Sequence, residues 1–224
     1  MAKVHGVAGE WARVRGVVWG LWPLFLGVFV SGAAVALLWT SVLLGWSLLV
    51  ASLVYVIFAL SVGLHRVERF YKGARGEEKV AGVLANLPAA YHVFNDFAIG
   101  RDRVDHVVVG PTGVFAVETK FWNGQVTVED GYVLLNGRLP SHSPLAQVDR
   151  EAAQVRKALA TSGWKGPVVP VLAFASDSFV PRSAEVKGAI VANSNELLSI
   201  FVAGRTVLPS AELERLVSLM ENCP

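Results

Sequence analysis

The sequence predicts a chain of two parts: a hairpin of two transmembrane helices, followed by an α/β domain with a mixed β-sheet flanked by helices. Two observations lead to this fold class. The 224 residues are 53% hydrophobic and only 17% charged, with a mean hydropathy of +0.47, and the apolar excess is concentrated near the N-terminus. The rest of the chain alternates between short β-branched segments and amphipathic helical segments, which is typical of a mixed α/β domain.

The first part is defined by an apolar run without charges. No Asp, Glu, Lys, Arg or His occurs from Val17 to Leu64, a run of about 48 residues. One transmembrane helix needs about 20 residues, so the run predicts two helices, at about 17–39 and 42–64. Tryptophans at both expected interfaces are typical of aromatic belts, and they are Trp19, Trp22, Trp39 and Trp46.

Basic residues flank this run and are missing from its turn. They are Lys3, Arg13 and Arg15 before the run, and Arg66, Arg69, Lys72 and Arg75 after it. By the positive-inside rule, both termini face the cytoplasm of a multi-pass plasma-membrane protein. A secretory signal cleaved near residues 34–36 is disfavoured because the apolar run continues past it. A buried hairpin in a soluble protein is disfavoured because its helices rarely lack charges on every face.

The anchor region and the remaining domain differ in charge. Residues 1–72, the membrane anchor, hold six Lys and Arg against two acidic residues, so residues 73–224 carry a net charge of −2. The soluble domain is therefore not a basic module that coats nucleic acid. The single cysteine, Cys223, can form no internal disulfide, which fits a reducing cytoplasm. Four glycines in the hairpin could allow close helix packing, within the chain or with an oligomeric or other protein partner: Gly20, Gly27, Gly32 and Gly45.

The periodicity of residues 73–224 predicts an ordered set of elements. In chain order they are a helix over 74–87, strands over 91–97, 104–109 and 114–120, two short strands over 125–129 and 132–135, a helix from 143 to about 160, strands over 168–175 and 189–192, and helices over 195–202 and 210–221. The segment Gly110–Gly113 and the pair Asp130-Gly131 indicate two hairpin turns. Pro144 favours a helix start after Ser143, and Pro170 suggests an edge strand or a bulge.

The first hairpin brings charged residues together. A four-residue loop pairs Val109 with Val114, and the same register places Asp105 opposite Glu118. Lys120 shares the face of Glu118, because residues two apart on a strand point the same way. Opposed carboxylates repel each other, and hard oxygen ligands favour Mg²⁺ or Mn²⁺ between them. The alternative is a ladder of surface ion pairs, and a slip of one residue in the loop would break the pairing.

A third acid belongs to the preceding helix. Glu77 lies on the apolar stripe of Val80, Leu84 and Leu87, which is the face that the helix buries. The alternative reading is that Glu77 only stabilises the N-terminus of this helix through the helix dipole.

Three ordered segments resemble the nuclease-related (NERD) domain of the PD-(D/E)xK, restriction-endonuclease-like superfamily. They carry Gly-x-x-Gly-Glu at residues 73–77, Asp-His and Gly-x-Phe-x-x-Glu-x-Lys within 104–120, and Pro-x-x-Gln within 143–147. The resemblance covers about 73–165 and leaves 166–224 as a C-terminal α/β extension. It implies a restriction-endonuclease-like mixed β-sheet flanked by helices.

The resemblance also implies residue roles. Asp105 and Glu118 would be metal ligands, with Glu77 completing the acidic cluster. Lys120 would position or activate the attacking water, and Gln147 would orient water, metal or phosphate. Without the resemblance, Gln147 would be interpreted as a solvent-facing residue beside the apolar stripe of its helix.

Two neighbours of these residues complete the picture. His106 is expected to point to the opposite face and to serve packing. Phe121 departs from the family, which often has a polar residue at this place.

The function implied is a membrane-tethered metal-dependent nuclease (a phosphodiester hydrolase) acting on DNA rather than RNA. The alternative is a catalytically idle, membrane-anchored module that binds nucleic acid or a protein, which the net charge of −2 favours. A small transporter or pore is disfavoured because the hairpin has no ionisable residue to line a pathway.

Overall fold

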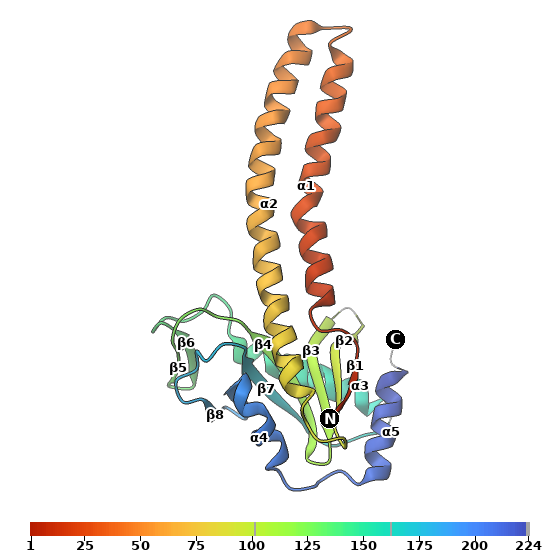
Figure 1. Ribbon diagram of the computed structural model, residues 1–224, viewed down its shortest axis with the longest axis vertical. Coiled ribbons are helices and arrows are strands. Elements are labelled where there is room, and N and C mark those ends of the chain that lie inside the picture. The colour runs from red at the N-terminus through yellow and green to blue at the C-terminus, as the bar shows by residue number, and fades with distance from the viewer. Residues whose placement is uncertain (101, 162, 223–224) are drawn as a thin grey trace. The chain divides into compact units, whose positions relative to one another are not determined.

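The structure is a computed structural model that describes residues 1–224 except 101, 162 and 223–224. Cys223 therefore lies outside the described residues. The chain divides into two compact units, one of residues 10–74 and one that combines residues 1–9 with residues 75–224 (Figure 1).

The first unit is a hairpin of two long helices. Helix α1 (Glu10–Leu37) and the larger part of helix α2 (Val42–Leu84) are joined by residues 38–41. Both helices are long and apolar enough to cross a membrane, and only 17% of the most apolar window of each is buried. A core helix of a soluble protein would be mostly buried instead.

The helices of this hairpin pack through small residues. A Cβ at Gly20 or Gly27 would lie 2.5 Å from a valine side chain of α2, Val67 or Val56 respectively. A hydrogen bond of 2.9 Å from Ser31 Oγ to Ser52 Oγ joins the two helices farther along. Most of the glycines marked by the sequence therefore serve contacts within the hairpin, whereas an added Cβ at Gly32 would have no atom within 4 Å.

Helix α2 extends beyond the apolar run. The sequence predicted a separate helix from residue 74, but α2 is continuous from Val42 to Leu84. No proline interrupts it, and Gly73 and Gly76 lie inside it, where each glycine costs about 1 kcal/mol without ending the helix. Glu77 is therefore about two turns from the C-terminal end of α2, and the alternative of an acid at a helix N-terminus is wrong.

The second unit is built on a seven-stranded mixed sheet, as predicted for an α/β domain (Figure 1). The strands are β1 (Lys3–His5), β2 (His92–Ile99), β3 (Asp102–Gly110), β4 (Gly113–Lys120), β7 (Val168–Phe174), β8 (Ser183–Val186) and β9 (Ala189–Asn193), in the order β1-β2-β3-β4-β7-β9-β8. Strands β2, β3 and β4 pair antiparallel, while β4, β7 and β9 run parallel. Strands β5 (Val126–Glu129) and β6 (Tyr132–Leu135) form a separate hairpin.

The predicted register of the first hairpin is confirmed. Val109 pairs with Val114, and the pairs continue to His106 and Val117. The ladder ends there, one residue before the expected pair of Asp105 and Glu118.

Strands β1 and β8 were not predicted, and strand β7 has a different place in the sheet from the one expected. Strand β7 is central rather than at an edge. Pro170 is tolerated there because it pairs with β4, whereas the ladder to β9 begins only at Val171. The backbone N–H that Pro170 lacks is therefore not needed for pairing with β9. Strand β1 lies at the edge of the sheet, parallel to β2, although residues 1–9 had been assigned to the anchor.

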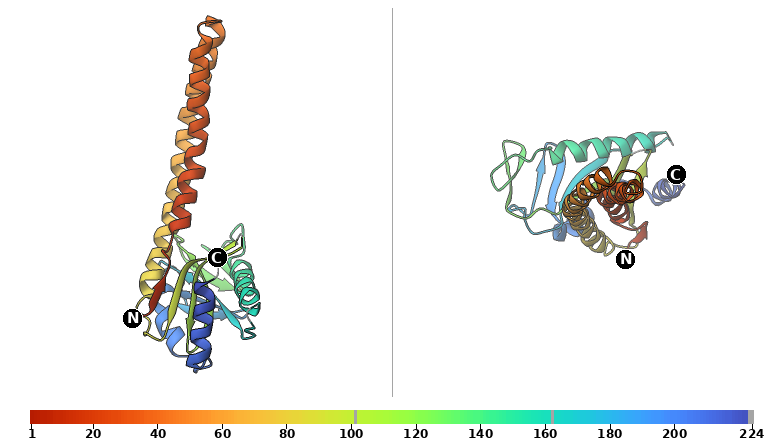
Figure 2. Two further views of the ribbon diagram at one scale, coloured as in Figure 1. Left: turned by 90° about the vertical axis from the view of Figure 1, so that its right-hand side faces the viewer. Right: turned by 90° about the horizontal axis from the view of Figure 1, so that it is seen from above.

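Helices cover both faces of the sheet (Figure 2). On one face, helices α3 (Pro144–Ala160) and α5 (Ser210–Glu221) pack against Val107 and Ala116. On the other face, the end of α2 and the short helices η1 (Ser194–Glu196) and α4 (Leu197–Val202) lie on the side of Val108 and Phe115. Alternate residues of β3 and β4 therefore face different helical layers, which decides the surroundings of each polar side chain.

Candidate active site

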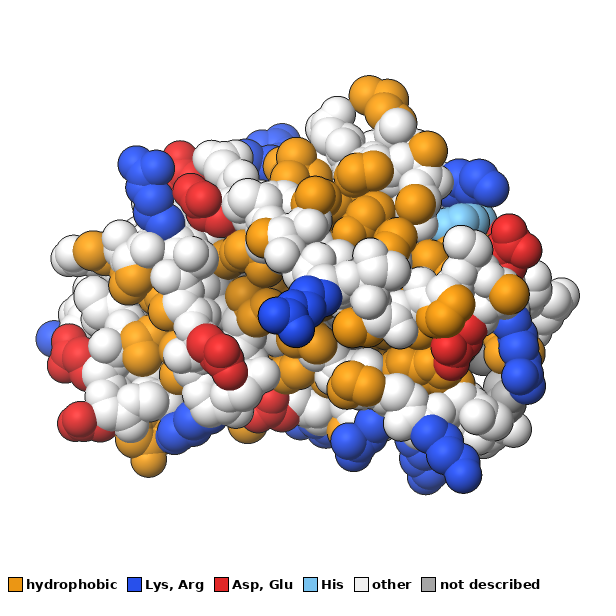
Figure 3. Space-filling view, turned by 90° about the horizontal axis from the view of Figure 1, so that it is seen from below, with side chains coloured by type: hydrophobic (Ala, Val, Ile, Leu, Met, Phe, Trp, Pro, Cys, Tyr) orange, Lys and Arg blue, Asp and Glu red, His pale blue; other side chains and the backbone are white. Residues whose placement is uncertain are grey.

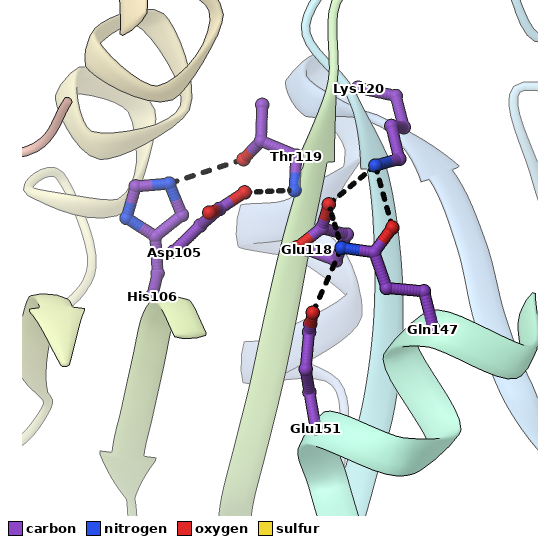
Figure 4. A network of polar contacts seen from close by, with 7 residues as sticks. All are labelled: Asp105, His106, Glu118, Thr119, Lys120, Gln147 and Glu151. Carbon is purple, nitrogen blue, oxygen red and sulfur yellow. Dashed lines mark hydrogen bonds and ion pairs between the residues drawn. The ribbon is translucent and has the colours of Figure 1, made fainter. Parts of the chain in front are cut away.

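A lysine, a glutamate and a glutamine meet between β4 and α3 (Figure 4). Lys120 Nζ donates to Glu118 Oε1 at 2.6 Å and to Gln147 Oε1 at 2.9 Å. Gln147 Nε2 also donates to Glu118 Oε1, at 2.7 Å. These three residues, which were predicted from two separate motifs, thus form one closed hydrogen-bonded triangle.

Local structure explains how this triangle forms. Glu118 and Lys120 are two residues apart on β4, so both point toward α3. Helix α3 begins with Pro144 after the N-cap Ser143, whose Oγ accepts from Ala146 N at 3.3 Å, as the sequence predicted. Gln147 therefore stands in the first turn of α3, where its side chain points to Glu118 and Lys120 rather than to solvent.

Asp105 lies where the β3–β4 ladder ends. Its Oδ2 accepts from the backbone N–H of Thr119 at 2.8 Å, so the carboxylate takes the place of a strand partner. Burial raises the pKa of Asp105 well above its usual range, and the negative charges of Glu118 and Glu77 raise it further. Asp105 and Glu118 thus repel each other, although they are not a ladder pair.

Glu77 approaches the same acids from α2. Its carboxylate accepts a hydrogen bond from the backbone N–H of Gly9, and burial followed by the charges of Asp96 and Glu118 raises its pKa to about 7. A Cβ at Gly76 would lie 2.9 Å from Phe121 Cβ. The glycine therefore allows α2 to pass close to the end of β4, which brings Glu77 within electrostatic range of the cluster.

Sequence reasoning missed a fourth acid, Glu151. It lies one turn after Gln147 on α3, is only 5% exposed, and accepts from Gln147 Nε2 at 2.9 Å through Oε1. Burial, and then the neighbouring charge of Glu118, raises the pKa of Glu151 to about 8. The sequence did contain a signal for this residue, because Glu151 lies on the apolar stripe of Val148 and Val155. Glu77 was recognised in the same way, from its place on the apolar stripe of its own helix.

The other face of β4 carries a neutral network. His106 is fully buried, with Nδ1 2.8 Å from Asn95 Oδ1 and Nε2 3.2 Å from Thr119 Oγ1. Because an amide oxygen only accepts, Nδ1 carries the proton, and Nε2 accepts from the threonine hydroxyl. Burial lowers the pKa of His106 to about 3, so the ring is neutral. His106 therefore lies apart from Glu118 and Lys120, as expected.

Two of the carboxylates, those of Asp105 and Glu118, could hold a hard divalent cation whose remaining ligands are not protein groups. The negative charge of Glu118 raises the pKa values of Glu77, Asp105 and Glu151, and Lys120 lowers those of Glu77 and Glu151. Within the described residues, no group of three or more His, Cys, Asp or Glu is arranged to hold a metal ion. Mg²⁺ commonly uses one or two carboxylates and completes its shell with water and substrate phosphates. Asp105 and Glu118 suit that mode of binding better than a closed protein cage.

Comparisons with known proteins agree with the motifs. Residues 72–175 match the family model described as the nuclease-related domain, NERD, and this segment contains all the acids above together with Lys120 and Gln147. A stretch of 62 residues is 36% identical to an uncharacterised protein of Bacillus anthracis, covering 25% of this chain and 29% of that protein. The chain thus spans less than a third of the length of that relative. No solved structure matches the chain. These findings support the assignment of the segment around the site to the nuclease-related domain family.

Proposed function

We propose that the chain is a membrane-tethered nuclease that hydrolyses phosphodiester bonds in DNA with the help of Mg²⁺ or Mn²⁺. The observation that carries this proposal is the ammonium of Lys120, held by Glu118 and Gln147 beside a cluster of partly buried carboxyl groups. The family match supports the same chemistry.

Each site residue has a distinct role in this proposal. Asp105 and Glu118 would hold the divalent cation, and Glu77 would add negative charge from α2. A bound cation would polarise the scissile phosphate and lower the pKa of the attacking water. Lys120 would stabilise the negative charge that develops on the phosphate oxygens. Gln147 would hold the lysine in that direction through its carbonyl oxygen.

Because the pKa of Asp105 is raised, binding of a cation should be coupled to release of a proton. The pKa of Asp105 lies well above its usual range, so without a cation this carboxyl group tends to retain a proton. A divalent cation must displace that proton, and its affinity should therefore rise with pH.

We further propose that α1 and α2 anchor the nuclease in the plasma membrane, with both termini and the soluble unit in the cytoplasm. Basic residues on both sides of the uncharged run support this orientation. In a Cys223→Ser background, an impermeant thiol reagent applied to intact cells should label Ser41→Cys and not Lys187→Cys. Labelling of Lys187→Cys from outside would overturn the orientation.

An idle binding module is the second candidate. Residues 73–224 carry a net charge of −2, and Figure 3 shows Lys and Arg interspersed with Asp, Glu and apolar side chains on one face. A domain with a net negative charge gives little overall electrostatic attraction for DNA, which favours this candidate or a partner that delivers the substrate.

A nuclease assay separates the two candidates. The full chain is purified in detergent or nanodiscs, because residues 1–9 supply strand β1 of the sheet. Single-stranded DNA, duplex DNA and RNA are each incubated with Mg²⁺, with Mn²⁺ and with chelator. Cleavage of DNA that requires the cation supports the nuclease. Binding without cleavage under every condition would favour the idle module.

A further inference from the structure

Glu151 is a buried acid that packing does not require. It is 5% exposed on a face of α3 that otherwise buries Val148, Ala152 and Val155. Its Oε1 accepts from Gln147, while Oε2 is buried and has no hydrogen-bond partner among the described residues. An apolar side chain would fill this place without the cost of burying a carboxyl group. A carboxyl group at this position therefore calls for a role in the site.

The contacts of Gln147 indicate that role (Figure 4). The amide nitrogen donates to Glu118 Oε1 at 2.7 Å and to Glu151 Oε1 at 2.9 Å, and the amide oxygen accepts from Lys120 Nζ at 2.9 Å. An amide turned by 180° would place its oxygen against two carboxyl groups and its NH₂ against an ammonium. Glu118 and Glu151 therefore select the same orientation of Gln147 from two sides.

We propose that Glu151 is a positioning residue, which fixes the amide of Gln147 so that its oxygen holds the ammonium of Lys120 toward the substrate phosphate. Among the described residues, no hydrogen bond or ion pair joins Glu151 to Lys120, whereas Gln147 is hydrogen-bonded to both. The part of this proposal that concerns catalysis rests on the proposed nuclease function. The part that concerns the direction of Lys120 does not.

The test is a double-mutant cycle in the full chain. Glu151→Met keeps the side-chain volume and removes the acceptor, whereas Glu151→Gln keeps an acceptor oxygen. Gln147→Ala and the double variant Gln147→Ala/Glu151→Met complete the cycle, and Asp149→Asn serves as a control on an exposed acid of the same helix. Thermal melts establish that each variant is folded.

For cleavage, Glu151→Met should lower kcat on the order of tenfold without a change in KM, since loss of an indirect support of a metal site typically costs 10–100-fold. Glu151→Gln should restore most of this loss, and Asp149→Asn should cleave like wild type. In the Gln147→Ala background, Glu151→Met should have no further effect, because its route to Lys120 is already gone.

A second measurement does not depend on cleavage. An amine-reactive reagent modifies lysines, and the rate at Lys120 is followed by mass spectrometry with exposed Lys157 as internal reference. Glu151→Met should raise the rate at Lys120 several-fold, and it should add nothing in the Gln147→Ala background. If wild type cleaves nothing but this pattern holds, the nuclease proposal fails and the positioning proposal stands. An unchanged rate at Lys120 in Glu151→Met, or full additivity in the cycle, would overturn the positioning proposal.

Discussion

The two faces of strand β4 carry polar networks of opposite character (Figure 4). On the face toward α2, His106, Asn95 and Thr119 are buried and neutral, and both ring nitrogens of the histidine have partners. On the face toward α3, Glu118, Lys120, Gln147 and Glu151 form a charged network. It leaves one buried carboxylate oxygen of Glu151 without a partner among the described residues.

This difference separates a network that stabilises the fold from one that serves chemistry. Buried polar groups in stable proteins are normally satisfied, and the histidine network follows that rule. The charged network instead concentrates acids, and the negative charge of Glu118 raises the pKa values of Glu151 and of nearby Asp105. Proteins keep such costly arrangements mainly at functional sites. The two faces should therefore respond differently to substitution.

The largest expected effect is on catalysis, from Lys120→Ala. Removing one group that stabilises transition-state charge typically lowers the rate by about 100-fold or more. Cleavage by the purified full chain should fall by at least that factor, while a cooperative thermal melt shows that the variant is still folded. The exposed Lys79→Ala is the matched control and should cleave normally. Equal cleavage by Lys120→Ala and wild type would show that the activity belongs to another site.

Substitution on the face of β4 toward α2 should lower the stability of the fold. His106→Leu leaves Asn95 Oδ1 and the Thr119 hydroxyl buried without their partner. Each such loss costs about 1–3 kcal/mol, so the free energy of unfolding of the soluble unit should fall by about 2 kcal/mol or more. Denaturant titration measures this change, with the exposed His142→Leu as control. A variant that lost cleavage but kept its full stability would place His106 in the chemistry and contradict the contrast between the faces.

The two faces should also give opposite pH dependences of stability. The pKa of His106 is lowered to about 3, so the unfolded chain binds a proton near pH 6.5 that the folded chain does not. This contribution to stability is present above pH 6.5 and is lost as the pH falls below it. The pKa of Glu151 is raised from 4.5 to about 8, so the folded chain retains a proton that the unfolded chain releases. That contribution is present below pH 4.5 and is lost as the pH rises toward 8.

Substitution tests this contrast. In the metal-free protein, Glu151→Gln should reduce the loss of stability between pH 5 and pH 8, an effect on the order of 1–2 kcal/mol. His106→Leu should reduce the loss below pH 6.5. Melting temperatures across pH 4–9 provide the measurement. Parallel profiles for wild type and both variants would show that neither group titrates as its burial implies.

The sequence alone predicted the face of β4 that carries Glu118 and Lys120 better than it predicted the residues that other elements place around that face. The loop Gly110–Gly113 and the two-residue period were enough to place Glu118 and Lys120 on one face and to pair Val109 with Val114. These features depend on local geometry, which a sequence records directly. Gln147 needed the family resemblance, because its spacing alone fits a solvent-facing position.

Other parts depend on contacts that are distant in sequence. Strand β1 has only three residues and follows no local signal, and its place beside β2 is set by pairing across nearly 90 residues. The N–H of Gly9 reaches Glu77 in the same way. The continuity of α2 also escaped prediction, since the sequence analysis assigned a separate helix over 74–87, whereas α2 runs through Gly73 and Gly76 without a break. Glu151 could have been found, as an acid on an apolar stripe.

The smallest effect concerns the repulsion between the acids. Asp105→Asn keeps an oxygen that can accept from Thr119 N, and it removes a charge that Glu118 and Glu77 oppose. At pH 8, the metal-free protein should gain about 0.5–1 kcal/mol in the free energy of unfolding, the scale of a like-charge pair across strands. Glu118→Gln should gain less, because it also loses the 2.6 Å contact with Lys120.

Both substitutions should remove most of the stabilisation that Mg²⁺ gives the wild-type protein, since a cation that binds only the folded state raises its stability by an amount that grows with the logarithm of its concentration relative to Kd. Both should also abolish cleavage. Thermal melts of the three proteins with Mg²⁺ and with chelator decide the matter, because they need no substrate. If both variants are less stable than wild type in chelator and keep its full Mg²⁺ shift, Asp105 and Glu118 do not share a cation. The excess of acid on this face of β4 would then need another explanation.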